Sequence, residues 1–517
     1  MTRDFKEELW KSADKLRANS SLKYSEFARP VLGIVFLRYA DYKFSIVEQD
    51  LKKDEKDTSR RRKVSETDFI ERGAIYLPEI ARFSYLLNLP ERENIGLALN
   101  EAMKAIEEYN DDLKGVLDID YQKIRKDTLV ALLNQFSTLE FYTREDVFGE
   151  IYEYFLGKFA LKEGQRGGQF FTPESLVKLI VEVLEPNHGR IYDPACGAGG
   201  MFIQSANFLR KKGKDPSAEL SFYGQEVIAD TIKLCKMNLA VHGLFSQEIK
   251  QENTYYNDVH NSLGRFDFVM SNPPFNVNGV DKEKIKRDKR FSYGIPTVDN
   301  ANYLWIQIFL KALNDSGRCG FVMANSAADI GQSELELRKK IIEDKVVDVI
   351  IAIGTNFFHN VTLPCTLWFF DKGKKGTERE DNVLFIDARE IYNQVDRAHK
   401  DFLPEQIELI GNIVRLYKRK ELSFRDGSKK LIKKIFLDSN YEDILGLCKV
   451  TSIDEISNQG FSLNPGRYVG IPENADEDLD YFETLNELYN NLLNLNSESG
   501  KLEKSIISNL EILIKKE

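Results

Sequence analysis

Arg190-Ile191-Tyr192-Asp193-Pro194-Ala195-Cys196-Gly197-Ala198-Gly199-Gly200 is the stretch of sequence that decides the fold. It places an acidic residue at the end of a short apolar strand, then a glycine-rich turn, and then a helix. Glycines let the backbone approach a ligand closely, and the N-terminus of the helix supplies free N–H donors. We therefore expect an α/β sheet in which this turn lines a binding site.

The composition of the turn narrows the kind of ligand it can hold. It lacks the Lys-Ser/Thr pair of a phosphate-binding P-loop and the G-x-G-x-x-G spacing of dinucleotide-binding turns. Asp193 precedes the glycines, where its carboxylate would repel a pyrophosphate and attract a cationic sulfonium-amino acid. The binding residues predicted in this turn are Asp193, Pro194, Gly197, Ala198 and Gly199.

The surrounding residues 146–472 carry the pattern of a single sheet domain. Short apolar runs are mostly separated by helix-like segments, which predicts a parallel, doubly wound sheet. The runs are 190–192, 221–223, 266–270, 320–323, 346–353 and 366–370. The last two lie close together and permit an antiparallel hairpin at one edge. The expected fold class is therefore α/β, with a Rossmann-like core.

The segments on either side, 1–145 and 473–517, have helical periodicity instead. Leu9, Trp10 and Ala13 are typical of packed helices in the first segment. In the second, leucines and isoleucines from Leu479 to Leu513 form an apolar stripe with polar flanks. Such a stripe packs on its own domain or on a partner helix. We expect an N-terminal helical domain and a C-terminal helical tail for subunit assembly.

Two polar residues at the ends of the next strands extend the predicted binding site. Glu226 ends the second strand, where a carboxylate can accept hydrogen bonds from both hydroxyls of a ribose. Asn253 follows the expected third strand. It could hydrogen-bond an adenine edge, although a simple Asx turn is nearly as well supported.

A second strand-end motif, Asn272-Pro273-Pro274-Phe275, follows the apolar run 266–270. An amine attached to an aromatic ring is a poor nucleophile, and two well-placed acceptors for its hydrogens favour the reactive pyramidal nitrogen. The Asn272 amide oxygen and the Pro273 carbonyl can supply these acceptors, and the prolines stiffen the turn. Phe275 offers a face on which an extruded base can stack. The alternative is a structural turn with Phe275 in the core.

Upstream, Gly168-Gln169-Phe170-Phe171-Thr172-Pro173 precedes a predicted helix. Thr172 is expected to be the N-cap of this helix, with Pro173 at its first position. The glycine and paired aromatic residues before the cap indicate in addition a loop folded over a ligand.

Bulk composition bears on location and partners. The chain has a net charge of −10, and its five cysteines show no C-x-x-C pair. Together with the lack of a signal peptide or a 20-residue apolar stretch, this predicts a cytoplasmic protein without a zinc site. A protein that binds DNA alone usually presents a basic surface. Either a local basic groove or another subunit would therefore hold DNA.

This set of motifs resembles the amino-methyltransferases of DNA, and more closely the modification (M) subunit of type I restriction–modification systems. The resemblance extends over nearly the whole chain, including residues 9–17, 35–39 and 302–307. It implies an adenine-N6 DNA methyltransferase that uses S-adenosyl-L-methionine and acts on double-stranded DNA with a flipped adenine. It also adds Gly168, Gln169, Phe170, Phe171, Thr172 and Pro173 to the cofactor-binding residues.

The same resemblance implies partners and leaves two alternatives. A specificity (S) subunit would read the DNA sequence in an M2S1 assembly, and a restriction (R) subunit would join for ATP-dependent cleavage. No membrane is expected to be involved. The alternatives are an N-P-P-type methyltransferase acting on RNA or protein glutamine, and a catalytically idle assembly subunit.

The basic loop 276–290, poor in apolar anchors, is expected from its own composition to remain mobile until DNA arrives.

Overall fold

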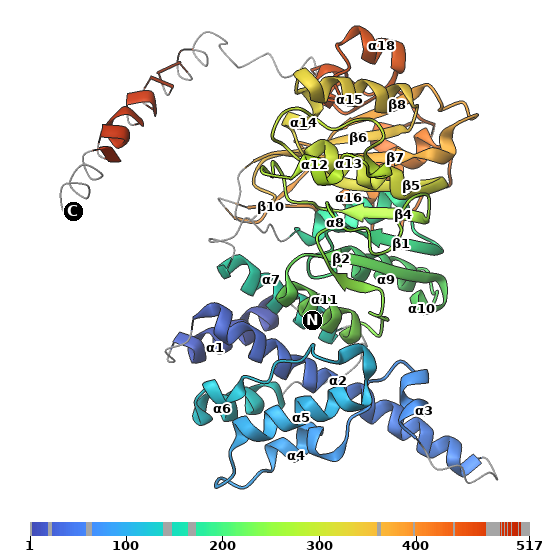
Figure 1. Cartoon of the computed structure of the whole chain (residues 1–517). Coiled ribbons are helices and arrows are strands. Elements are labelled where there is room, and N and C mark those ends of the chain that lie inside the picture. Colours follow the sequence, from blue (N-terminus) through green and yellow to red (C-terminus); the bar gives the residue numbers. More distant parts are fainter. Residues whose placement is uncertain are drawn as a thin grey trace.

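The computed structural model divides the chain into a helical end and a sheet-containing end (Figure 1). It describes residues 3–18, 23–57, 65–137, 147–163, 172–358, 363–396, 399–437 and 440–471. In the C-terminal segment it describes 486, 489–490, 492–493, 495–497, 499–504 and 506–507. No helix in this part of the chain is long and apolar enough to cross a membrane.

The N-terminal region is helical, as the periodicity predicts. Its α-helices are α1 (Arg3–Ala18), α2 (Tyr24–Asp57), α3 (Glu66–Glu71), α4 (Phe83–Leu87), α5 (Ile95–Tyr109) and α6 (Lys126–Ser137). Short 3-10 turns η1 (Glu79–Ala81), η2 (Asp111–Leu113) and η3 (Tyr121–Lys123) connect them. The first helix of the segment expected to form the sheet domain, α7 (Val147–Glu163), packs in the same helical core. Trp10, Phe36 and Phe155 lie in one buried core. That core also takes in Met237 and Val241, so the helical region packs directly on the sheet domain.

The second region is built on one nine-stranded sheet, which confirms the predicted fold class. The strands are β1 (Gly189–Asp193), β2 (Leu220–Glu226), β3 (Ile249–Gln251), β4 (Phe266–Ser271), β5 (Leu313–Ala324), β6 (Val347–Ile353), β7 (Cys365–Asp371), β8 (Asn382–Asp387) and β11 (Cys448–Ser452). Their spatial order is β11-β8-β6-β7-β5-β4-β1-β2-β3. The pairs from β3 to β5 are parallel. Every residue of β6 and β7 is buried, as expected for strands covered on both faces.

The predicted antiparallel hairpin is present as β6 and β7, but the sheet continues beyond it. β8 pairs with β6 in parallel, and β11 pairs with β8 in antiparallel orientation at the edge. The hairpin therefore lies inside the sheet. A further small pair, β9 (Asn393–Gln394) and β10 (Lys400–Asp401), stands apart from it.

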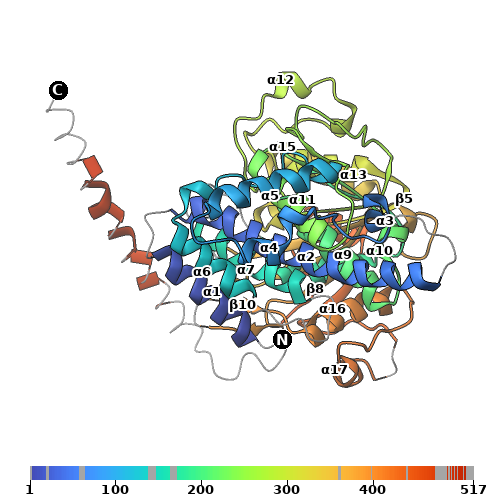
Figure 2. The same cartoon turned by 90° about the horizontal axis from the view of Figure 1, so that it is seen from below.

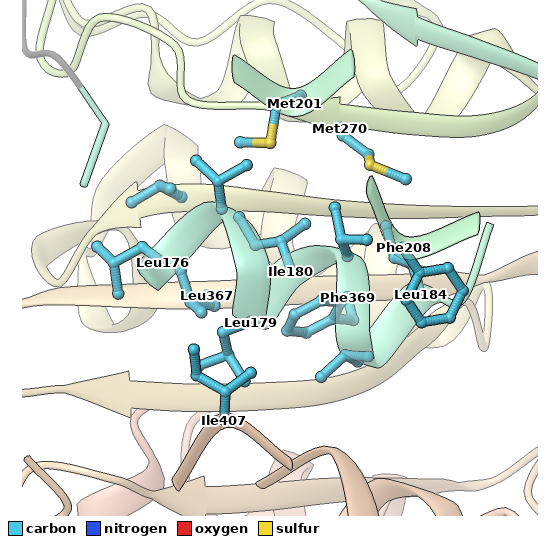
Figure 3. Close-up of a cluster of buried hydrophobic side chains, with 14 of the residues drawn as sticks. Leu176, Leu179, Ile180, Leu184, Met201, Phe208, Met270, Leu367, Phe369 and Ile407 are labelled. Atoms are coloured by element: carbon cyan, nitrogen blue, oxygen red, sulfur yellow. The ribbon is translucent and has the colours of Figure 1, made fainter. Parts of the chain in front are cut away.

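Helices cover both faces of the sheet. One face is covered by α8 (Glu174–Leu184), α9 (Gly200–Lys211), α11 (Ala229–Val241), α16 (Pro404–Tyr417) and α17 (Lys429–Ile435). In Figure 3, α8 packs between Met270, Phe369 and Ile407. The other face is covered by α12 (Lys282–Ile285), α13 (Asn302–Ala312) and α15 (Gln332–Glu343). Figure 2 shows α12 and α17 on opposite sides of the molecule.

The remaining elements are short. They are α10 (Pro216–Glu219), α14 (Ser326–Asp329), α18 (Ile453–Asn458), and the 3-10 turns η4 (Lys289–Phe291), η5 (Lys372–Lys374) and η6 (Pro465–Arg467). The described C-terminal residues between 486 and 507 are helical. Because β1, β2 and β4 are neighbouring parallel strands, their carboxyl ends meet at one edge. The residues predicted to form the site follow those ends.

Candidate active site

The turn between β1 and α9 has a backbone that favours glycine. Gly197 and Gly199 adopt positive φ angles of 52° and 83°. A Cβ on Gly199 would lie 2.9 Å from the Cys235 sulfur, whereas one on Gly197 would meet nothing within 4 Å. Gly199 is therefore needed for packing behind the turn, and the space in front of Gly197 is open to a ligand.

Glu226, at the end of β2, holds the turn in place. Its Oε2 accepts a hydrogen bond from the Gly197 N–H at 3.2 Å, and its Oε1 accepts from the N–H groups of Val227 and Ile228 at 2.9 and 3.1 Å. A carboxylate offers about four acceptor positions. Oε2 thus retains room for a hydroxyl of a bound ribose, while the same side chain fixes the loop.

Asp193, at the end of β1, is a buried carboxylate. Its Oδ1 accepts hydrogen bonds from the Ser271 hydroxyl at 2.7 Å and from the Ala195 N–H at 3.0 Å. Burial raises the pKa of Asp193 to about 7, with a contribution from the negative charge of Glu226, although both hydrogen bonds act in the opposite direction. The group thus changes charge near neutral pH, and a cation placed beside it would favour the ionised form.

Asn272, directly after β4, has one satisfied and one unsatisfied polar atom. Its Nδ2 donates a hydrogen bond to the Thr172 hydroxyl oxygen at 2.8 Å. Its Oδ1 is buried and has no hydrogen-bond partner among the described residues. An unpaired buried acceptor costs about 1–3 kcal/mol. Such an atom fits a position reserved for a donor on the substrate.

The predicted N-cap role of Thr172 is wrong. The cap position of α8 is occupied by Pro173, whose carbonyl accepts from the N–H groups of Leu176 and Val177, and no side chain caps the helix. The Thr172 hydroxyl points instead to Asn272, which is 100 residues away in the chain. Gly168, Gln169, Phe170 and Phe171 lie outside the described residues.

The remainder of the Asn-Pro-Pro-Phe turn is held by a clamp that sequence analysis missed. The Asn276 N–H donates to Asn302 Oδ1, and Asn302 Nδ2 donates back to Asn276 Oδ1, both at 2.9 Å. Asn300 Nδ2 adds a bond of 3.1 Å to the same oxygen. Within the turn Pro273 is buried, Pro274 is exposed, and Phe275 packs against the core below. Asn302 lies in the segment 302–307 that contributes to the family resemblance, but its position in the sequence does not indicate a contact with this turn.

Asn253 forms the Asx turn that was the alternative to a ligand contact. Its Oδ1 accepts from the Tyr255 N–H at 3.0 Å. The next residue, Thr254, donates its hydroxyl to the Pro194 carbonyl at 2.6 Å. The loop after β3 is therefore bonded to the glycine-rich turn, and Asn253 supports the wall of the site.

The basic loop 276–290 has anchors that its sequence did not suggest. Ile285 and Arg290 are each only 1% exposed. The Arg290 guanidinium donates to the carbonyls of Thr254 and Tyr255 and pairs with Asp288. The loop, expected to be poor in apolar anchors, thus has one at Ile285, and Arg290, one of its six basic residues, is a further buried tie to the β3 loop.

Those predicted residues that the structure describes thus converge on one edge of the sheet. Hydrogen bonds connect Thr172 to Asn272 and Ser271 to Asp193, while Glu226 holds Gly197. This arrangement offers a carboxylate for a cation, open space at a glycine turn, and an unpaired acceptor beside them.

Comparison with known proteins gives two family matches. Residues 143–477 match the N-6 DNA Methylase family, and residues 5–136 match the HsdM N-terminal domain. The chain is 36% identical to the methylase subunit of the type I restriction enzyme MjaIX of Methanocaldococcus jannaschii, over 99% of this chain and 92% of that protein. It is 35% identical to the HindI methylase subunit of Haemophilus influenzae, over 88% of this chain and 98% of that protein.

Solved structures have the same fold. The methyltransferase subunit of a type I restriction–modification system from Streptococcus thermophilus superposes with a TM-score of 0.73 at 22% identity, covering 91% of this chain and 100% of that one. A modification subunit of a putative type I restriction enzyme from Vibrio vulnificus gives 0.57 at 18% identity, covering 88% and 93%. At these identities the likeness concerns the fold.

Proposed function

The chain belongs to the N-6 DNA methylase family, among the methylase subunits of type I restriction enzymes, and from this premise we propose that it transfers a methyl group from S-adenosyl-L-methionine to the N6 amine of a flipped adenine in double-stranded DNA. The observation that carries the proposal is the Asn272 Oδ1, which is buried and has no hydrogen-bond partner in the part of the chain that the structure describes. The exocyclic amine of adenine supplies the missing hydrogen.

Asn272 and Pro273 activate the amine by accepting its two hydrogens. The amide oxygen accepts a hydrogen bond from one N–H, and the backbone carbonyl of Pro273 accepts one from the other, so that the nitrogen becomes pyramidal and its lone pair is free to attack the methyl group. Preorganised acceptors of this kind act through position rather than basicity. Phe275 supports the extruded base by stacking.

The residues of the glycine-rich turn fit S-adenosyl-L-methionine. When bound, the cofactor supplies an electrophilic methyl group on a positively charged sulfur. Asp193 contributes a negative charge in a buried position, and Gly197 leaves open space beside it. Glu226 retains an acceptor for a ribose hydroxyl. We assign cofactor binding to Asp193, Pro194, Gly197, Ala198, Gly199 and Glu226 and, from the sequence motifs, to residues 168–173 and Asn253.

Sequence recognition and cleavage fall to separate partners in this proposal. A specificity (S) subunit binds two copies of the chain in an M2S1 assembly, and a restriction (R) subunit joins the full complex. The described part of the C-terminal helix supports a docking role, because Leu495, Leu502 and Ile506 are 63%, 63% and 56% exposed. A surface of this kind on a terminal helix marks a protein interface.

Methyl transfer from tritiated S-adenosyl-L-methionine to DNA, RNA and protein tests the proposal. The full chain is measured with and without its specificity partner. We expect incorporation into DNA, dependent on the partner. Incorporation into RNA or protein alone, or none into DNA from the complete complex, would show that the proposed substrate is wrong.

A further inference from the structure

We propose that α17 and the turn before it form a second DNA-binding surface, distinct from the active site, which contacts the phosphate backbone. The proposal rests on DNA being the substrate. Residues 418–434 contain eight lysines and arginines against two acidic residues, a net charge of +6 in a chain whose total is −10. A DNA backbone is repelled by most of such a molecule, so a concentrated basic segment determines where it binds.

The four lysines of α17, together with Arg425, are the basic residues of this segment that form no ion pair within the described residues; Arg425 donates instead to the Lys211 carbonyl. Lys418, Arg419 and Lys420 pair with Asp348, Glu378 and Glu185 respectively. By contrast Lys429, Lys430, Lys433 and Lys434 are all exposed, and no ion pair to them occurs within the described residues. Phe424 is 39% exposed, and its ring centroid lies 5.9 Å from the Lys429 ammonium, so an aromatic side chain stands beside the lysines.

Mutual repulsion among these four lysines lowers the stability of α17. Lys429 and Lys433 are four residues apart, as are Lys430 and Lys434, and like charges at this spacing destabilise a helix by about 0.2–0.5 kcal/mol per pair. No acidic residue of α17 relieves them. Like-charge repulsion that no neighbouring acidic residue of the helix offsets is expected at positions that serve a function.

The surface is nevertheless firmly held. Ile432 and Phe436 are fully buried beneath the lysines. Glu408, itself 1% exposed, accepts from the N–H groups of Asp426 and Ser428 at 3.0 and 2.9 Å. The lysines are thus presented by an anchored turn and helix. Because α17 lies across the molecule from α12 (Figure 2), its contacts are separate from those of the loop beside the active site.

Salt-dependent DNA binding tests this surface. The variant K429Q/K430Q/K433Q/K434Q is compared with K52Q/K53Q/K114Q/K123Q, which removes the same charge from lysines that pair with acidic neighbours in the helical domain. Each is purified as the full chain with its partner and titrated with short and long labelled duplexes. Loss of four phosphate contacts reduces the slope of log K against log salt by about 0.9 each. The expected result is weaker, less salt-dependent binding of the long duplex by the α17 variant alone.

Three outcomes would overturn the proposal. Equal losses in both variants would mean that only net charge matters. Unchanged DNA binding in the α17 variant would exclude the surface. Unchanged DNA binding with loss of partner co-elution would assign the lysines to an acidic protein surface instead. Binding is measured without methyl transfer, so failure of the proposed chemistry at Asn272 would not affect the result.

An independent observation concerns Thr172, and from it we infer that this residue positions Asn272 for catalysis and acts on rate through it. The Thr172 hydroxyl accepts from Asn272 Nδ2, so Oδ1 is turned away from Thr172 and left for the substrate. Pro173 and the first turn of α8 fix the place of Thr172, because the Pro173 carbonyl bonds to the helix. This inference rests on the proposed role of Asn272.

Thr172→Val removes the hydroxyl with nearly the same shape, and Thr172→Ser retains it. Single-turnover methylation by Thr172→Val is expected to be about 10-fold slower or more, as for one lost polar contact, and the reaction is run at saturating cofactor so that any change in cofactor Kd does not enter the rate. DNA binding should be unchanged, and Thr172→Ser should be close to the parent. In a double-mutant cycle with Asn272→Ala, the effects should not add.

A different pattern would contradict the positioning role. If Thr172→Val weakens cofactor binding while the rate at saturation is retained, Thr172 is a cofactor-binding residue only. If Asn272→Ala is slow but Thr172→Val is normal, the proposed chemistry stands and this inference fails. If Asn272→Ala is itself normal, the proposed function fails first.

Discussion

The loops that follow β1 and β4 lie side by side at the carboxyl edge of the sheet, yet they use their polar groups differently. In the β1 loop the N–H of Gly197 is bonded to Glu226, and the carboxylate of Asp193 accepts two hydrogen bonds. In the β4 loop, among the described residues, the Asn272 amide is hydrogen-bonded through its nitrogen and not through its oxygen. The carboxylates around the first loop hold the loop in place and keep further acceptor positions for the cofactor, whereas the second loop leaves a whole acceptor atom for the substrate.

This difference separates binding from chemistry. Changes around the β1 loop should alter the dissociation constant of the cofactor, whereas changes at Asn272 should alter the rate at saturating cofactor. Ser271 joins the two loops, because its hydroxyl from the end of β4 bonds to Asp193. Variants that fail to separate affinity from rate would break the comparison.

The largest effect is expected for Gly199→Val. The new side chain would begin 2.9 Å from the Cys235 sulfur at a φ of 83°, which a β-branched residue adopts only with strain. Cofactor affinity by calorimetry should fall by more than about 100-fold. Gly213→Val is the matched control, since Gly213 has a φ of 73° and nothing within 4 Å. Similar losses in both variants would point to general strain.

A smaller loss of cofactor affinity is expected for Glu226→Ala, which also changes the surroundings of the β1 loop. This change removes the acceptor for a ribose hydroxyl and the bond to the Gly197 N–H. The dissociation constant should rise by roughly 30- to 150-fold, corresponding to about 2–3 kcal/mol. Methyl transfer at saturating cofactor should remain close to that of the parent. A lower saturated rate with unchanged affinity would place Glu226 in the chemistry instead.

The pH dependence of cofactor binding tests whether the Asp193 carboxylate binds a positively charged ligand. Burial raises its pKa to about 7, so the group is neutral below that value and ionised above it. A cationic ligand prefers the ionised form. Affinity should therefore fall by up to about tenfold per pH unit below 7 and level off above it. Asp193→Asn should bind weakly and without this dependence, and a flat profile in the parent would show that no cation meets this carboxylate.

The smallest effect is expected for Ser271→Ala, which tests the link between the loops. The hydroxyl bond favours the ionised form of Asp193, so its removal raises the pKa further. The midpoint of the pH profile should move upward, and affinity at pH 7 should fall by several-fold, about 1 kcal/mol. Above the new midpoint, affinity should return to the parent value. A pH-independent loss would mean that Ser271 matters only for packing.

Much of this arrangement could be predicted from local sequence. Asp193, Glu226 and Asn272 each follow an apolar run, and parallel strands bring their ends together whatever lies between them. The sheet interior was also predictable, since β6 and β7 are mostly apolar, with Asp348 in β6 and Thr366 and Asp371 in β7 as the exceptions.

Contacts between distant residues could not be predicted in this way. Thr172 has the pattern of a helix cap, but its hydroxyl bonds across 100 residues to Asn272. Arg290 lies among lysines that indicate a solvated loop, yet it is buried against carbonyls of the β3 loop. The strands β8 and β11 lie beyond the hairpin, and β11 pairs with β8 across about sixty residues of chain. In each case the partner, and not the local pattern, decides the structure.

The central claim is that Asn272 activates the N6 amine of adenine. The most direct test is nucleoside mass spectrometry of DNA after single-turnover reaction of the full chain and its Asn272→Ala variant, each with the specificity partner and saturating S-adenosyl-L-methionine. The account predicts N6-methyladenine as the product of the parent and a loss of about 100-fold or more in its rate of formation by the variant, with cofactor affinity retained. Formation of N6-methyladenine by Asn272→Ala at the parent rate, or methylation of another base by the parent, would contradict it.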